Sequence, residues 1–169
     1  MEINKSTRHQ KIIGNFGEAL ICNWLSRSGF EVTIVDHTGI DIVAYHAETK
    51  KHPEKRIGIT VKSRTRVKRL ETSSVNILSY QKEKDDRQKV LDSCQAFACE
   101  PWIGIYVEST TCADMYLLSL KQYDQCYRGR DDRKIDDWKM GNQYMKKYDK
   151  DPEVHHVHID FKETNWEWK

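Results

Sequence analysis

The stretch GIDIVAYHAETKKHPEKRIGITVK, residues 39–62, decides the fold of this chain. It contains two short apolar segments joined by a charged link that includes a proline, as in an exposed hairpin loop. Side chains alternate between the two faces of a strand, so Asp41 points away from the isoleucines beside it. In the second segment, Thr60 and Lys62 point away from the apolar side chains in the same manner. The stretch therefore predicts two neighbouring strands that carry polar groups on one face.

A carboxylate and a lysine that meet on neighbouring strands suit the hydrolysis of a phosphodiester. The carboxylate of Asp41 would hold a hard divalent cation, and the ammonium of Lys62 would stabilise charge or position the attacking water. Each residue also has an ordinary explanation, because an aspartate close after Gly39 is a common turn residue and a lysine at a strand end usually reaches solvent. The rest of the chain decides between these interpretations.

The composition indicates a soluble globular protein with a very polar surface. Of the 169 residues, 32% are charged and 38% are hydrophobic. This length is enough for one domain with a proper core, or for one domain with an appendage. The net charge of +2 gives no argument for nucleic acid, so local clusters of charge must supply one. The apolar runs are only as long as strands, which excludes a membrane span, and the N-terminus does not resemble a signal peptide. A cytoplasmic protein is expected.

The cysteines indicate a reducing compartment. There are five of them, an odd number, and no pair has the CxxC spacing. Free thiols, several of them buried, are therefore expected, and no zinc site is expected.

The periodicity of apolar residues predicts the other elements. Helices are expected at 8–28, 85–99 and 121–127. Strands are expected at 30–35, 102–107, 115–120 and 154–161, with 102–107 central and buried on both faces. The charged segment 129–151 is expected to be a loop with a helix at the edge, and 70–79 has no clear assignment.

The first helix carries an acid on a partly apolar face. Its apolar side chains recur every three or four residues, at Ile13, Phe16, Leu20 and Trp24, and also at Ile21 and Leu25. Glu18 shares a face with Gly14, Ile21 and Leu25, so it is not simply a solvated acid. Two glycines, Gly14 and Gly17, cost stability early in a helix, and they suggest a close approach of another backbone.

The motifs and their order resemble a known nuclease superfamily. The segments GNFGEALICNWLSRSGFEV, GIDIVA and GITVKSRTR, together with the order helix, three strands, helix, two strands, resemble the PD-(D/E)xK superfamily over residues 8–120. Within it, the chain looks most like archaeal Holliday junction resolvase-like and restriction endonuclease-like proteins. The resemblance implies an α/β fold with a three-layer α/β/α core around a mixed sheet. Residues 1–125 would form this nuclease-like domain, and residues 126–169 a C-terminal extension packed on it.

The resemblance also implies an activity and its residues. It implies a Mg²⁺- or Mn²⁺-dependent endonuclease that cuts DNA as a homodimer, either branched DNA as a Holliday junction resolvase does or DNA as a restriction endonuclease does, with no membrane or nucleotide cofactor involved. By position, Glu18 and Asp41 would bind the metal, helped by a backbone carbonyl near Thr60, and Lys62 would orient the nucleophile. The family pattern has an acid where this chain has Thr60, and a hydroxyl is a poor ligand for Mg²⁺. Either Glu18 supplies the missing charge, or the site is impaired and the fold binds nucleic acid or a protein partner.

A row of basic residues follows Lys62. If the strand continues, Lys62, Arg64, Arg66 and Lys68 share one face, and Arg69 adds a fifth positive charge. Such a row matches a phosphate track. The alternative is a charged edge that blocks aggregation, but arginine binds phosphate through two hydrogen bonds, which favours the track. The acidic groups at 83–86 and 131–137 are expected to offset this charge elsewhere.

Two aromatic groups near the C-terminus have ordinary explanations. No carboxylate or cysteine pattern frames His155, His156 and His158, so the sequence does not predict a metal site there. Trp166 and Trp168 would stack on bases in a nucleic-acid complex, but packing against the sheet or a partner subunit is favoured.

Overall fold

The computed structural model describes residues 6, 8–35, 37–50, 53–67, 69–81, 84–129 and 135–163, so Lys68, Trp166 and Trp168 lie outside the described residues. Its helices are α1 (His9–Arg27), α2 (Asp86–Ala96), α3 (Leu120–Cys126) and α4 (Asn142–Tyr148). Its strands are β1 (Glu31–Ile34), β2 (Ile42–His46), β3 (Lys55–Thr65), β4 (Val75–Gln81), β5 (Lys84–Asp85), β6 (Glu100–Glu108), β7 (Cys112–Ser119), β8 (Ile135–Trp138) and β9 (His155–Asp160). Within these ranges, no helix is both long and apolar enough to cross a membrane.

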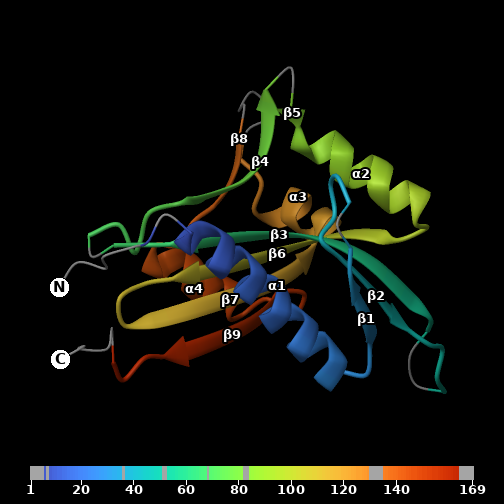
Figure 1. Ribbon diagram of the computed structural model, residues 1–169, viewed down its shortest axis with the longest axis horizontal. Coiled ribbons are helices and arrows are strands. Elements are labelled where there is room, and N and C mark those ends of the chain that lie inside the picture. Colours follow the sequence, from blue (N-terminus) through green and yellow to red (C-terminus); the bar gives the residue numbers. More distant parts are fainter. Residues whose placement is uncertain are drawn as a thin grey trace.

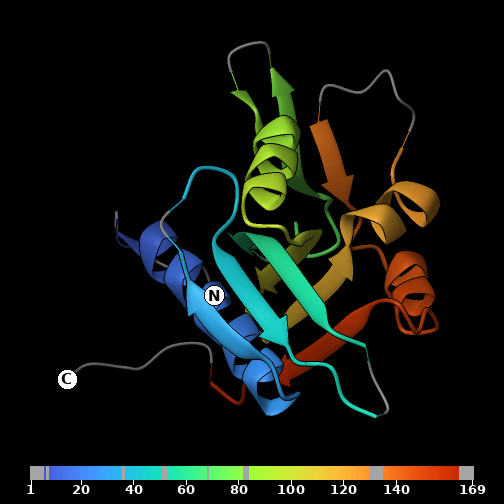
Figure 2. The same ribbon diagram turned by 90° about the vertical axis from the view of Figure 1, so that its right-hand side faces the viewer.

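The centre of the molecule is a six-stranded sheet with the order β1-β2-β3-β6-β7-β9. It is mixed, because β3 and β6 are parallel and the other neighbours are antiparallel. Helix α1 crosses one face of the sheet (Figure 1), and α2, α3 and α4 lie on the other face (Figure 2). The predicted three-layer α/β/α arrangement and its element order are confirmed, with β4 and β5 inserted between β3 and α2.

Strand β6 is central, as its continuous apolar run predicts. It lies between β3 and β7, and all six of its residues at 102–107 are buried. Strand β6 contributes side chains to the apolar clusters on both faces of the sheet. Ile103 packs on the side of α2, and Tyr106 packs on the side of α1. Burial on both faces therefore fixes the sheet between its helix layers.

A second, three-stranded sheet is built from the segment without a clear assignment and from part of the charged segment 129–151, for which a loop and a helix are expected. Its order is β5-β4-β8, and β4 and β8 pair across a long separation in sequence. Strand β9, by contrast, extends the main sheet beside β7, as expected from its alternating pattern. The C-terminal part of the chain thus contributes one strand to each sheet. Strand β8 was missed because its four residues, IDDW, carry two acids and no clear alternation.

The packed face of α1 differs from the predicted one. Its buried residues are spaced four apart, at Ile13, Gly17, Ile21 and Leu25. Phe16 and Trp24, which the periodicity placed in the core, keep 48% and 37% of their surface exposed. The reason is the close approach of helix and sheet along the buried stripe, where a Cβ at Gly104 would collide with Ile21 Cδ1. The buried stripe that contains Gly17 faces the sheet, and the large side chains of Phe16 and Trp24 lie beside this stripe.

The two glycines of α1 have different surroundings. A Cβ at Gly17 would collide with Ser63 Oγ and lie 3.1 Å from Tyr106 Cβ, so the expected close approach occurs there. A Cβ at Gly14 would have no neighbour within 4 Å. Close packing therefore accounts for Gly17 and not for Gly14.

This contrast predicts opposite effects for one substitution on one helix. Gly14→Ala should stabilise the protein by about 0.5–1 kcal/mol, because alanine favours the helix and the added methyl group has space. Gly17→Ala gains the same propensity but overpacks the contacts with Ser63 of β3 and Tyr106 of β6, at a cost of roughly 1–3 kcal/mol, and should be destabilising. Urea unfolding followed by circular dichroism measures both. Equal effects of the two variants would contradict the packing of α1 described here.

All five cysteines are free, as the sequence predicts. Cys94 is buried on α2, and burial raises the pKa of its thiol to about 12. Cys126 is exposed at the end of α3. The sheet and helices therefore hold together without a disulfide.

Candidate active site

Asp41 is fixed between β2 and β3. It lies directly before β2, and its backbone N–H donates to the carbonyl of Ile59 at 2.8 Å. Its carboxylate Oδ2 accepts a hydrogen bond from the backbone N–H of Val61 at 2.6 Å. Both contacts are made to β3, so the sheet itself sets the orientation of this half-buried acid.

Three of the residues selected from the sequence line one cavity. Asp41, Thr60 and Lys62 border a hollow of about 170 Å³ on the face of the sheet that carries α2. Thr60 is 2% exposed, and the alternation of β3 places Lys62 on the same side two residues later. Asp41 and Lys62 therefore do meet, as the strand pattern predicts.

Helix α2 forms the opposite wall of the cavity. It begins after Asp85, whose side chain caps it by accepting a hydrogen bond from the backbone N–H of Gln88 at 3.0 Å. The turn before Asp41 packs directly on this helix at Gly39, which has a φ of +109°. A Cβ at Gly39 would collide with the carbonyl oxygen of Lys89, so glycine is required both by conformation and by space.

Asp86, in the first turn of α2, is an acid that the sequence reasoning did not place in the site. It lines the cavity together with Lys89 and Val90. Its Oδ2 accepts a hydrogen bond from the backbone N–H of Ser79 at 3.3 Å, and its Oδ1 lies 3.8 Å from Lys89 Nζ. The expectation that the acids at 83–86 lie away from the basic row is wrong for Asp86. No local signal marked it, because an acid at a helix start is sufficiently explained by the helix dipole.

Glu18 does not belong to the residues that line this cavity. It lies half-buried on α1, which packs on the opposite face of the sheet. Burial and then the Glu18 carboxylate raise the pKa of the Cys22 thiol, one turn further along the helix. The structure thus brings Asp41, Thr60 and Lys62 together, and the role of Glu18 in metal binding stays a prediction.

The donor set of the cavity fits a hard divalent cation. Two carboxylates, Asp41 and Asp86, face one hollow with the hydroxyl of Thr60. Mg²⁺ typically keeps several waters and takes one or two carboxylates from a protein. The ammonium groups of Lys62 and Lys89 border the same space, so anionic phosphate oxygens would also find positive charge there.

Positive charge continues along β3 away from the cavity. Lys62 and Arg64 line a neighbouring hollow of about 270 Å³, which Asp86 also borders. Arg64 is exposed, and its guanidinium donates to the carbonyls of Ser63 at 2.8 Å and Asn76 at 3.4 Å. Among the described residues, neither Lys62 nor Arg64 forms an ion pair with a carboxylate.

The predicted basic row is interrupted where β3 ends at Thr65. Arg66 is half-buried, and its guanidinium donates to the carbonyl of Ser74. Burial and then the charge of Arg64 lower the pKa of Arg66. Arg69 is exposed and has a φ of +86°. Arg64 and Arg69 are therefore open to solvent, whereas Arg66 is partly committed to the fold.

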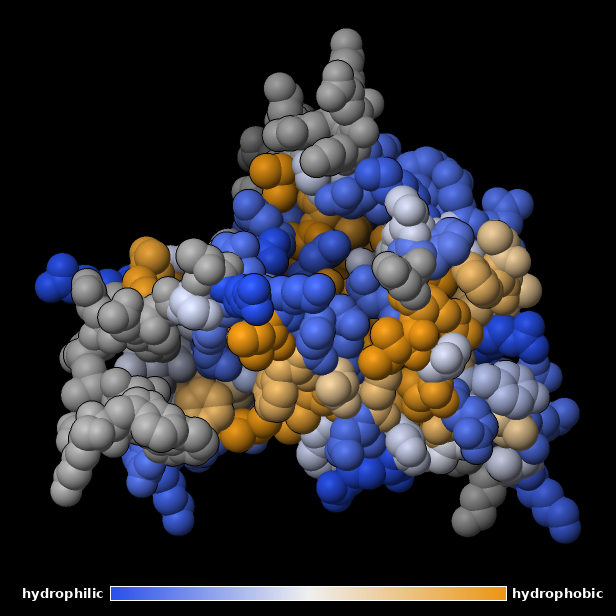
Figure 3. Space-filling model, in the orientation of Figure 1, coloured by the Kyte–Doolittle hydropathy of each residue, from blue (hydrophilic) through white to orange (hydrophobic). Residues whose placement is uncertain are grey.

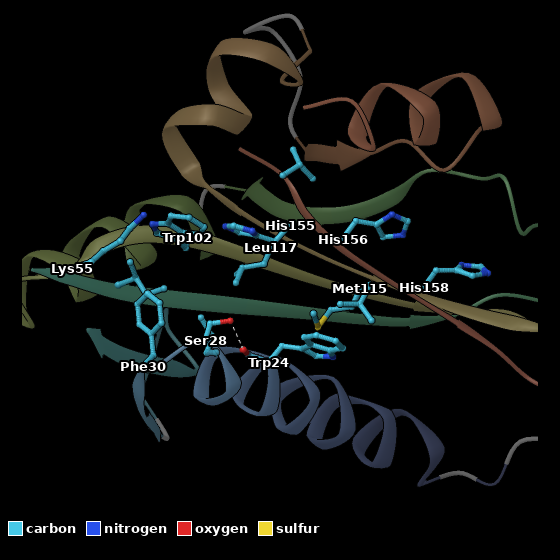
Figure 4. Close-up of a pocket in the computed structure, with 14 residues that line it drawn as sticks. Trp24, Ser28, Phe30, Lys55, Trp102, Met115, Leu117, His155, His156 and His158 are labelled. Atoms are coloured by element: carbon cyan, nitrogen blue, oxygen red, sulfur yellow. Dashed lines mark hydrogen bonds between the residues drawn. The ribbon is translucent and has the colours of Figure 1, made fainter. Parts of the chain in front are cut away.

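A larger and mostly apolar hollow of about 650 Å³ lies on the other face, between α1 and β9 (Figure 4). Within it, the rings of Trp102 and His155 stack with centroids 6.0 Å apart, and Lys55 Nζ lies 4.3 Å from the centroid of the Trp102 ring. Of the described residues that line it, none carries a carboxylate. It offers no anionic ligand for a hard cation among the described residues, so the smaller polar cavity is the candidate active site.

No protein-family profile matches the sequence, and no curated protein matches it significantly. Among solved structures, it is similar to Hjc, a Holliday junction resolvase from the archaeal hyperthermophile Archaeoglobus fulgidus, with a TM-score of 0.49 and 13% identity. The similarity covers 78% of this chain and 85% of that one. A similarity this distant indicates nothing about activity.

Proposed function

We propose that this protein is a divalent-metal-dependent nuclease that hydrolyses phosphodiester bonds in DNA, with its active site in the cavity of Asp41, Asp86 and Lys62. One observation carries the proposal. The carboxylate of Asp41, held by the Val61 N–H at 2.6 Å, shares a polar cavity with a second carboxylate and a lysine. Acids that hold a metal, combined with a cation that faces the substrate, suit phosphodiester hydrolysis.

In this proposal the acidic residues of the cavity bind the metal and the basic residues act on the water and the phosphate. Asp41 and Asp86 would hold Mg²⁺ or Mn²⁺, with Thr60 as a neutral neighbour. When bound, the metal supplies a water of lowered pKa and a polarised phosphate. Lys62 orients the attacking water and offsets the negative charge that develops on the phosphate. Lys89, 3.8 Å from Asp86, offsets part of the negative charge of this carboxylate.

Lys62 and Arg64 would guide the DNA backbone toward the cavity, and Arg69 would extend this track. Replacing Arg64 with alanine should weaken DNA binding by a similar factor for every sequence, because phosphate contacts carry no sequence information. The slope of log affinity against log salt should become less steep by about 0.9 for one lost contact. Fluorescence anisotropy with labelled duplexes over a range of salt concentrations measures both quantities.

Arg56 provides the matched control for this experiment. It is also an exposed arginine of β3, but it lies near the start of the strand, where it pairs with Glu54 at 3.6 Å. Arg56→Ala should therefore leave the salt slope unchanged. An Arg64→Ala variant that binds DNA with the affinity and slope of the parent would remove Arg64 from the proposed track.

A homodimer is part of the proposal, supported by the outer surface of α1. Ile12, Phe16 and Trp24 are 61%, 48% and 37% exposed and follow one another at multiples of four residues. Apolar surface gathers over this face of the molecule (Figure 3). A second copy of the chain would cover it, and sedimentation velocity tests this association.

The alternative function is a nuclease-like module that binds DNA or a protein partner without cutting. Thr60 favours it, because a hydroxyl occupies the position of an expected acid. Incubation of the protein with supercoiled plasmid and with a four-way junction, in Mg²⁺, in Mn²⁺ and after chelation, separates the two functions. Cleavage that requires metal supports the nuclease. Binding without cleavage of any DNA form would replace it with the module.

A further inference from the structure

A cysteine, an aspartate and a histidine meet near the β9 edge of the main sheet, on the face that carries α4. Cys112 and Asp114 lie two residues apart on β7 and therefore point to the same face. In the register of β7 and β9, Asp114 lies opposite His158. Strand β6 separates this pair of strands from β3. The cluster is thus distinct from the Asp41 cavity.

The three side chains can approach a single ion. One ligand atom from each of Cys112, Asp114 and His158 lies within 4.8 Å of the other two. Asp114 Oδ1 is 2.7 Å from His158 Nδ1. Around a tetrahedral zinc ion, such atoms would be roughly 3.3–3.6 Å apart, given usual bond lengths of about 2.0–2.3 Å. Small side-chain rotations are therefore sufficient.

Neighbouring groups already hold two of the three side chains in position. Asp114 is only 4% exposed, and His156 Nε2 lies 2.9 Å from its Oδ1, while His156 Nδ1 lies 2.7 Å from Asp149 Oδ1. Ser109 Oγ lies 3.2 Å from Cys112 Sγ. Partners of this kind orient metal ligands in proteins. His156 and Ser109 are positioning residues here.

Space for a further ligand lies beside the cluster. Cys112 and Asp114 line a hollow of about 260 Å³, which Met140 and Met145 also line. Three protein ligands and one open position are the arrangement in which zinc also takes a water or an exogenous ligand. His158 is exposed, so an ion can reach the cluster from solvent.

We infer that Cys112, Asp114 and His158 form a binding site for one zinc ion. Sulfur, nitrogen and carboxylate ligands together select zinc or a similar transition-metal ion over Mg²⁺, which takes oxygen ligands. Binding converts the thiol of Cys112 to a zinc-bound thiolate and releases its proton to solvent. The site therefore differs from the Asp41 cavity both in place and in the metal it takes.

Titration of the untagged, chelator-treated protein with Zn²⁺ and Co²⁺ in excess Mg²⁺ tests this site. We expect one Zn²⁺ per chain by calorimetry, and with Co²⁺ a thiolate-to-metal charge-transfer band. Cys112→Ser should lose the band, and both Cys112→Ser and His158→Ala should weaken zinc binding by more than about tenfold.

Three control variants isolate the site. Cys126→Ser removes an exposed thiol and His155→Ala removes a neighbouring imidazole, so both should bind zinc as the parent does. Asp41→Asn should also keep its zinc, which separates this inference from the proposed nuclease. A parent without the charge-transfer band, or zinc binding unchanged in Cys112→Ser and His158→Ala, would show that the cluster is only a network of hydrogen bonds.

Discussion

Replacing Asp41 with asparagine is expected to reduce metal-dependent nicking of DNA by more than about a hundredfold. Asparagine keeps the shape of the side chain, and its carbonyl oxygen can still accept the hydrogen bond that Val61 N–H donates to Asp41. The substitution removes the negative charge on which the metal depends and leaves the packing between β2 and β3 in place. Nicking rates at saturating enzyme, in Mg²⁺ and in Mn²⁺, measure the loss, and thermal unfolding checks that the variant is folded.

Asp92 supplies the control for this substitution. It is an exposed acid on α2, where it accepts a hydrogen bond from the side chain of Gln88 at 2.7 Å, and it does not line the cavity. Asp92→Asn should cut DNA at the rate of the parent. If Asp41→Asn also cuts at that rate while remaining folded, the cavity is not the active site.

The second carboxylate can be identified with the same assay. Asp86→Asn should lower the nicking rate and the affinity for metal, because the cavity would keep only Asp41 as an anionic ligand. Adding Thr60→Asp to this variant returns a carboxylate to the same hollow and should restore part of the activity. Full activity in Asp86→Asn would assign the second carboxylate to another residue, and Glu18 would then be the first to substitute.

The sequence was informative where the geometry of one strand decides the outcome. Alternation alone predicted that Thr60 and Lys62 share a face, and the strand pairing places Asp41 beside them. The buried run at 102–107 likewise predicted the central strand. These conclusions need only the two-residue period of a strand and the assumption that apolar side chains are buried.

The sequence was less informative where contacts join distant elements. Asp86 enters the cavity because α2 docks on β3, where Cys94 Sγ donates to the carbonyl of Gly58 at 3.6 Å. His158 meets Asp114 only because β9 pairs with β7 in one register, across 44 residues of sequence. The prediction of the buried face of α1 is wrong because Phe16 and Trp24 have the right spacing but are too large for the close approach of helix and sheet. Registers and docking positions of this kind are tertiary properties.

Asp136 illustrates the same limit in the second sheet. This acid of β8 is only 4% exposed, and it accepts hydrogen bonds from Arg87 Nη1 at 3.1 Å, from Arg128 Nε at 3.3 Å and from the hydroxyl of Tyr80. Its partners come from α2, from the end of α3 and from β4. One buried carboxylate therefore joins the second sheet to the helices beside the active site.

Asp136→Asn is expected to destabilise the protein by about 2–4 kcal/mol, because it removes the buried negative charge that two guanidinium groups share. Arg87 and Arg128 keep 14% and 24% of their side-chain surface in contact with solvent, so water relieves part of this cost. Urea unfolding followed by circular dichroism measures the change. Asp124→Asn removes the other acid that pairs with Arg87, at a position with 34% exposure, and should cost less than about 1 kcal/mol. Equal losses in the two variants would show that Asp136 acts as an ordinary surface partner and does not join the second sheet to the helices.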